Sequence, residues 1–182
     1  MGQNTEKINS INLLYLDSPS LNKLLNVSLH FQKLSSIIGS NCTQSKIQNL
    51  TSLKRQLKNN RSEIVYFLAH SDKDKGMYIG ENVNINGKKL AEIFPTQEKR
   101  LPKLVIFNTC YGVQSGLVEA CLNEGIETVV ASDKAVPIKG MCGYMETVFE
   151  GMEDKRKTLN SVVKQANKNF EKRNIEFITL KK

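Results

Sequence analysis

The run LVIFN at residues 104–108 decides the fold class of this chain. Four of its five residues are large and apolar, which is typical of a parallel strand buried on both faces. The runs IVYFLA at 64–69, INLLYL at 11–16 and TVVA at 128–131 have the same character. Together they predict a mostly parallel central sheet, to which a weaker run at 176–180 adds a last strand.

Amphipathic stretches separate these runs. We expect helices at residues 20–38, 47–57, around 88–94, 115–123, 139–152 and 159–173. Residues 76–79 and 81–85 predict a small hairpin with turn residues Gly80, Glu81 and Asn82. Strands that alternate with helices are typical of an α/β fold, and we expect a three-layer α/β/α sandwich with a mostly parallel central sheet.

Length and composition favour one domain. The 182 residues are 40% hydrophobic, enough for one sizeable core, so residues 1–182 are interpreted as a single domain. No apolar stretch reaches the roughly 18 residues of a membrane span, and the first residues lack the apolar centre of a secretory signal. We therefore expect a cytoplasmic protein with no membrane partner.

Cysteine and histidine usage indicates reduced thiols and no metal site. The cysteines lie far apart, without a Cys-x-x-Cys pair, at Cys42, Cys110, Cys121 and Cys142. The only histidines, His30 and His70, have no second ligand at metal-binding spacing. For Cys42, Cys121, Cys142 and His30 we expect packing roles.

The formal charge of +8 raises the question of nucleic acid as a partner. The basic residues are spread along the chain, with acidic residues among them, and no aromatic residues interleave with them as a base-stacking surface requires. We interpret them as a solvated surface and expect no direct contact with nucleic acid.

Two reactive side chains follow buried strands. His70 comes directly after residues 64–69, and Cys110 comes two residues after residues 104–108. Functional groups gather at the carboxyl ends of parallel strands, so we expect His70 and Cys110 to face each other as base and nucleophile. A helix expected to begin near Gln114 would stabilise the thiolate, and backbone N–H groups at Ser71 and Cys110 would bind an oxyanion.

At these positions the residues match a family. VYFLAHS at 65–71 resembles the strand and His-Gly element of caspase-like peptidases, and LVIFNTC at 104–110 resembles their strand ending in the nucleophile. The separation of 40 positions from His70 to Cys110 suits the CHAT branch, and residues 122–133 and 159–168 resemble that branch's later elements. The chain resembles a CHAT-type cysteine peptidase over nearly its whole length.

The resemblance implies a caspase-like fold and a cysteine endopeptidase that cleaves protein or peptide substrates with a Cys110–His70 dyad and no cofactor. Relatives commonly hold the residue before the cut in a charged pocket, so Asp133 is expected to bind substrate, with Asp72 and Asp74 on nearby loops. CHAT-type proteins often act as bacterial regulatory or defence effectors, including antiviral ones, and we expect a separate regulatory or sensor protein. Ser71 stands where the family usually has glycine, which leaves one oxyanion donor in question.

Two other readings remain open at this point. The first is a catalytically inactive caspase-like module that binds other proteins, which the Ser71 replacement favours. The second is a nucleotide- or phosphate-binding signalling domain, which requires a glycine-rich loop between a strand and a helix. Neither residues 17–20 nor residues 109–113 form a convincing loop of that kind.

Overall fold

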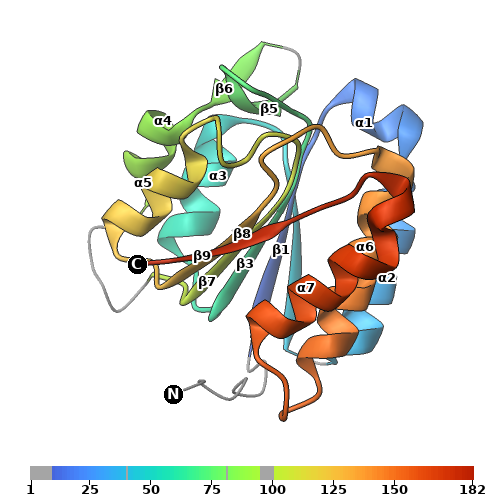
Figure 1. The fold of residues 1–182 in the computed structure, drawn as a ribbon. Coiled ribbons are helices and arrows are strands. Elements are labelled where there is room, and N and C mark those ends of the chain that lie inside the picture. Colours follow the sequence, from blue (N-terminus) through green and yellow to red (C-terminus); the bar gives the residue numbers. More distant parts are fainter. Residues whose placement is uncertain (1–9, 40, 81, 95–100) are drawn as a thin grey trace.

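The computed structural model describes residues 10–39, 41–80, 82–94 and 101–182. Its centre is a six-stranded sheet in the order β2-β1-β3-β7-β8-β9, seen in Figure 1. All neighbouring strands are parallel except β9, which runs antiparallel to β8. The strands in that order are β2 (Cys42–Ile47), β1 (Ile11–Leu16), β3 (Ile64–Leu68), β7 (Leu104–Asn108), β8 (Thr128–Ala131) and β9 (Ile178–Lys181).

Helices cover both faces of the sheet, so the expected three-layer α/β/α sandwich is confirmed (Figure 1). One face carries α1 (Pro19–Leu24), α2 (Val27–Ile38), α6 (Ile138–Met152) and α7 (Leu159–Phe170), which continues into a 3-10 turn at Glu171–Arg173. The other face carries α3 (Leu50–Lys58), α4 (Gly87–Ala91) and α5 (Leu117–Glu124). Among the described residues, no helix is both long and apolar enough to cross a membrane.

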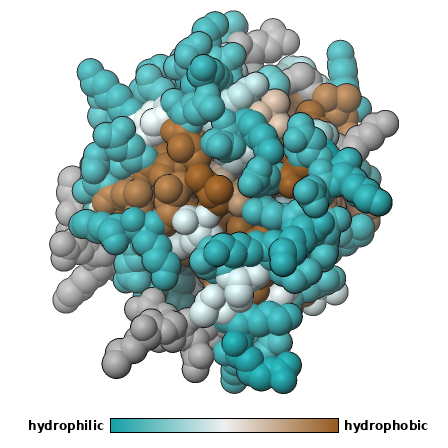
Figure 2. Space-filling view, viewed as in Figure 1, coloured by the Kyte–Doolittle hydropathy of each residue, from teal (hydrophilic) through white to brown (hydrophobic). Residues whose placement is uncertain are grey.

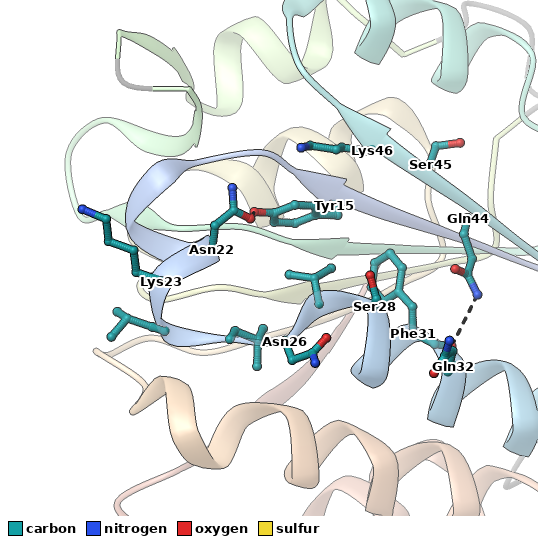
Figure 3. A pocket seen from close by; sticks show the side chains of 13 residues that line it. Tyr15, Asn22, Lys23, Asn26, Ser28, Phe31, Gln32, Gln44, Ser45 and Lys46 are labelled. Atoms are coloured by element: carbon teal, nitrogen blue, oxygen red, sulfur yellow. Dashed lines mark hydrogen bonds between the residues drawn. The ribbon is translucent and has the colours of Figure 1, made fainter.

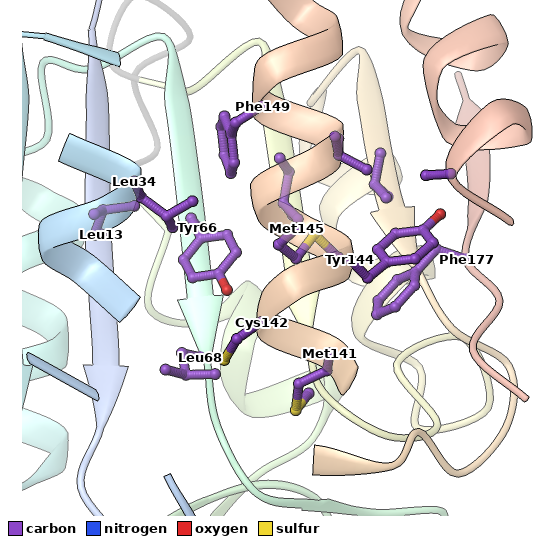
Figure 4. Packing of buried hydrophobic residues seen from close by; sticks show 14 of the residues in the cluster. Leu13, Leu34, Tyr66, Leu68, Met141, Cys142, Tyr144, Met145, Phe149 and Phe177 are labelled. Carbon is purple, nitrogen blue, oxygen red and sulfur yellow. The ribbon is translucent and has the colours of Figure 1, made fainter. Parts of the chain in front are cut away.

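Alternating side chains of the central strands fill two apolar layers. In β3, Tyr66 and Leu68 point to the α2/α6/α7 face, whereas Val65 and Phe67 point to the α3/α4/α5 face. Figure 4 shows Tyr66 in the first layer, where its ring meets the edge of Phe149 with 6.0 Å between centroids. Burial on both faces explains why these strands are continuous apolar runs.

A small second sheet extends from the carboxyl end of β3. It consists of β4 (Ser71–Asp72), β5 (Gly76–Ile79) and β6 (Val83–Ile85), paired antiparallel. The Gly80 N–H at the end of β5 donates to the Asp17 carbonyl oxygen, 2.6 Å away, which ties this sheet to the end of β1. The expected hairpin is thus confirmed in β5 and β6, and Glu81 of its predicted turn lies outside the described residues.

The predicted strands at 11–16, 104–108 and 128–131 are confirmed at their bounds, and the strand predicted at 64–69 ends at Leu68. The last strand begins two residues later than predicted, at Ile178. Strand β2 was not predicted, because its sequence CTQSKI is polar and only Ile47 at its end is fully buried.

The single helix predicted at 20–38 is wrong. The chain forms α1 and α2 instead, separated by an extended Leu25. The Asn26 side chain accepts the Leu29 N–H at 3.0 Å and caps α2, an arrangement that ends one helix and starts the next. The helix predicted at 47–57 begins at Leu50, where Asn49 and Ser52 form a capping box.

Helices α4 and α5 meet through two glycines. The Gly87 N–H donates to the Ser115 carbonyl oxygen at 3.3 Å, and a Cβ atom at Gly87 would overlap the backbone carbonyl of Gly116. Gly116 has a positive φ of 75°, which suits glycine. The backbones approach so closely that no side chain fits between them.

We predict that Gly87→Ala lowers the free energy of unfolding by about 2 kcal/mol or more, because the new methyl group forces two backbones apart. Urea denaturation of the variant beside wild type measures this, with Lys88→Ala at the exposed neighbouring position as the control. Equal loss in both variants would contradict the close contact.

Candidate functional site

The register of β3 and β7 aligns the two predicted catalytic residues. Leu68 pairs with Asn108 in the parallel ladder, so His70 and Cys110 each lie two residues beyond a matched pair. Neighbouring strands are about 4.8 Å apart, and side chains alternate between faces. Cys110 packs against the same apolar layer as Tyr66. The Ser71 hydroxyl donates to the Cys110 carbonyl oxygen, so the segments that follow β3 and β7 meet at the carboxyl edge of the sheet.

His70 is exposed to solvent and contacts β5 of the small sheet that follows it. Its ring stacks on Tyr78 of β5, with 5.8 Å between centroids and 28° between planes. Its carbonyl oxygen accepts the Tyr78 N–H at 2.9 Å. The N–H groups of Asp74 and Lys75 hold the pKa of Asp72 below its ordinary value, and the charge of His70 adds to this effect. An acidic group therefore lies close to the imidazole.

Cys110 is half-buried and contacts the loop that leads into α6. Its Sγ accepts the Val136 N–H at 3.3 Å and donates to the Val136 carbonyl oxygen at 3.7 Å. Val136 comes two residues before the first residue of α6. The Val136 backbone thus holds the thiol through both its N–H and its carbonyl group.

The expectation that a helix beginning near Gln114 lies against Cys110 is wrong. Helix α5 begins only at Leu117, because residues 111–116 form turns and Gly116 takes a left-handed conformation. The N–H that contacts the sulfur comes from the loop before α6 instead. Within the described part of the chain, no hydrogen bond joins His70 to Cys110, a contact that in enzymes often tightens only when substrate binds.

Ser71 is buried and linked to Cys110. Its hydroxyl donates to the Cys110 carbonyl oxygen, which also accepts the Thr109 hydroxyl at 3.3 Å. Because His70 forms a hydrogen-bonded pair with Tyr78, the alternation of an antiparallel ladder directs the Ser71 N–H away from β5. That N–H is therefore not used in the pairing of β4 with β5.

The residue after Cys110 has a strained backbone. Tyr111 has φ of 50°, the left-handed region that bulky residues rarely adopt. Its N–H donates to the Lys134 carbonyl oxygen at 3.0 Å, and the Val113 N–H donates to that of Ser132 at 3.2 Å. Such strain costs about 1–3 kcal/mol and concentrates at functional sites. These bonds fix the loop after β7 against the loop after β8.

Asp133 lies in the same loop after β8 but is not joined to the pair. It is exposed, and its carbonyl oxygen accepts the Gln114 side-chain amide at 2.6 Å. In the described structure its carboxylate makes no hydrogen bond or ion pair. The loop thus reaches Cys110 through Val136, while Asp133 points to solvent.

Asp17, which sequence reasoning did not single out, follows β1 at the same edge of the sheet. Tyr15 of β1 pairs with Leu68, so Asp17 follows β1 as His70 follows β3. Its carboxylate binds Asn22 at 2.8 Å and Lys46 at 3.0 Å. Although burial raises it, these partners hold the pKa of Asp17 below its ordinary value. Its position directly after the run INLLYL was the available signal.

A buried polar chain lies beneath the site. The Asn108 amide donates to the Tyr66 hydroxyl at 2.6 Å, which contacts His30 Nε2 at 2.9 Å, and His30 Nδ1 lies 3.3 Å from Glu146. The Oδ1 atom of Asn108 is buried without a hydrogen-bond partner. His30 thus packs as expected, and the chain ends two residues before Cys110. Among the described residues, no cluster of three metal-ligating side chains is present.

The comparisons with known proteins identify no family. No family model and no curated protein matches the chain.

We predict that the protein loses stability as the pH falls below about 6.5. Burial lowers the pKa of His30, although Glu146 opposes this effect, so the unfolded chain takes up a proton more readily than the folded one. The stability held by neutral His30 is present above its unfolded pKa and lost as the pH falls through its folded pKa, with a slope of up to about 1.4 kcal/mol per pH unit. Urea unfolding between pH 7.5 and 5 should show a shallower slope for His30→Gln than for wild type. Identical slopes in the two proteins would contradict the prediction.

Proposed function

We propose that the chain is a cysteine endopeptidase with Cys110 as nucleophile and His70 as base. The observation that carries this proposal is the matched register of β3 and β7, in which Leu68 lies opposite Asn108, two residues before His70 and Cys110. Two features support it: the Val136 N–H on Cys110 Sγ, and the strained backbone of Tyr111 next to the nucleophile. The resemblance of residues 65–71 and 104–110 to CHAT-type caspase-like peptidases points to the same reaction.

In the proposed reaction, His70 takes the Cys110 proton and Sγ attacks the carbonyl carbon of a peptide bond. A carbon–sulfur bond forms and the carbonyl oxygen becomes an anion. The intermediate collapses, the C–N bond breaks, and His70 gives its proton to the departing amine. Water then hydrolyses the thioester and frees the thiol. The reaction needs no cofactor.

Ser71 contributes to this reaction in two ways. Its N–H, directed away from β5, is the candidate oxyanion donor. Its hydroxyl holds the Cys110 carbonyl and so fixes the peptide that carries the nucleophile. In this proposal Ser71 lacks the conformational freedom of the usual glycine, but its side chain adds a contact to Cys110 that glycine cannot make.

The proposed substrate is a protein or peptide chain, as the CHAT resemblance implies, and the exposed His70 is accessible to it. Asp133, with Asp72 and Asp74, would favour a basic residue before the cut. We further propose a regulatory or defence role under a separate sensor protein, as in the CHAT branch.

A catalytically inactive interaction module is the second candidate. It is favoured by the position of the Cys110 thiol, which bonds to both backbone groups of Val136 and, among the described contacts, not to His70. In that case the caspase-like fold would be retained for binding alone.

We predict that wild-type protein cleaves members of a mixed peptide library and that Cys110→Ala and His70→Ala each reduce cleavage by about 1,000-fold or more. Mass spectrometry of the products gives the cut sites, and Cys42→Ala serves as the control that keeps activity. A preference for Lys or Arg before the cut that Asp133→Asn abolishes would support the substrate assignment. Cuts that persist in Cys110→Ala would contradict Cys110 as the nucleophile, and a complete absence of cuts would favour the second candidate.

We predict that Ser71→Ala lowers kcat about tenfold with little change in KM, because the hydroxyl orients the Cys110 peptide without touching substrate. Ser71→Gly should resemble Ser71→Ala, since both variants keep the N–H and lose the hydroxyl. Steady-state kinetics on a peptide cleaved by wild type measures both. Wild-type kcat in Ser71→Ala would contradict a positioning role.

A further inference from the structure

A groove of about 830 Å³ lies at the edge of the central sheet away from β9. Figure 3 shows it between β2, which carries Gln44, Ser45 and Lys46, and the helical wall with Phe31 and Gln32. Lys23 lies at the α1 end of the groove. The pair His70 and Cys110 does not line it.

The floor and rim of this groove contain exposed apolar groups. Leu24 is 58% exposed, Leu25 and Val27 are half-buried, and Phe31 closes the bottom. Figure 2 shows brown apolar atoms at the upper right of the molecule, where Figure 1 places α1. Such a surface, next to polar side chains, marks an interaction site more often than a bare solvent face.

One wall of the groove is an unpaired strand edge. The Ile11 N–H donates to the Asn41 carbonyl oxygen, and the Asp17 N–H donates to that of Ile47, so odd-numbered residues of β2 bond to β1. By the alternation of a parallel ladder, the backbone groups of Gln44 and Lys46 point outward. Among the described residues, no strand pairs with this outer edge.

The charge of the groove selects its occupant. Its described lining contains two cations, Lys23 and Lys46, and no carboxylate. Lys46 is paired with Asp17, whereas Lys23 has no ion pair in the described structure. A second copy of the chain, at a net charge of +8, would bring like charges together at this edge.

We propose that β2 and this groove bind an extended, acidic segment of another protein by adding it to the sheet as an extra strand. Main-chain hydrogen bonds to Gln44 and Lys46 give affinity, alternate apolar side chains enter the groove over Leu24 and Phe31, and a carboxylate pairs with Lys23. The inference goes beyond the proposed peptidase activity and does not depend on it.

The test is selection of binders from a random display library of peptides about 12 residues long. The protein used is the full chain with Cys110→Ala, so that peptides are not cut. We expect enriched peptides in which apolar residues alternate with others and which contain Asp or Glu. We expect Lys23→Glu and Leu24→Ser, both at exposed positions, to weaken the best peptide about tenfold each.

Matched controls separate this groove from other surfaces. Lys54→Glu reverses a charge on α3, and Leu29→Ser removes an exposed apolar side chain of α2 that does not line the groove; both should leave affinity unchanged. N-methylation of alternate amides in one register of the peptide should abolish binding, because it blocks the ladder without altering the protein.

Several outcomes would overturn the inference. The first is a consensus of basic or uncharged peptides, or no enrichment at all. The second is a peptide affinity that Lys23→Glu and Leu24→Ser do not change. The third is tight binding by both methylated peptides, whichever set of alternate amides carries the methyl groups. Self-association that Leu24→Ser disrupts would assign the groove to a second copy of the chain instead.

Discussion

The parallel pairing of β3 with β7 is the constraint on which the site depends. Because Leu68 lies opposite Asn108, the chain leaves both strands in step, and His70 and Cys110 each follow two residues later. A slip of one residue would turn one side chain to the opposite face of the sheet. Both strands are buried on both faces, so such a slip is costly. It would move aromatic residues such as Tyr66 from one apolar layer to the other, where they do not fit the packing. The energetics of the core thus set the geometry of the candidate chemistry.

Three loops at one sheet edge build on that register. The small sheet after β3 supplies the stacked Tyr78 and the buried Ser71. The loop after β7 supplies Cys110, and the loop after β8 supplies the Val136 N–H. The strained Tyr111 is held between the second and third loops. Most of these contacts go to backbone groups, so the arrangement depends on loop conformation more than on particular side chains. The same sheet offers a separate groove at its β2 edge, which His70 and Cys110 do not line.

The sequence predicted the layers and most strands because a strand buried on both faces needs a continuous apolar run. It did not predict β2, since an edge strand with polar side chains has no such pattern. The places of His70 and Cys110 after β3 and β7 followed from the two buried runs, and their catalytic pairing stays a prediction. The contact of Cys110 with Val136 could not be foreseen, because it joins residues 26 apart through a backbone N–H that no residue type marks. The left-handed conformation of Tyr111 could not be predicted either, because that conformation is usually found at glycine.

The central claim is that Cys110 is a nucleophile activated by His70. Its most direct test is treatment of the folded protein with a peptidyl acyloxymethyl ketone, followed by peptide mapping of all four cysteines. The account predicts an adduct on Cys110, none on the half-buried Cys42, and labelling of Cys110 that is slower by about 100-fold or more in His70→Ala. Equal labelling of Cys42 and Cys110, or a rate that His70→Ala does not change, would contradict it.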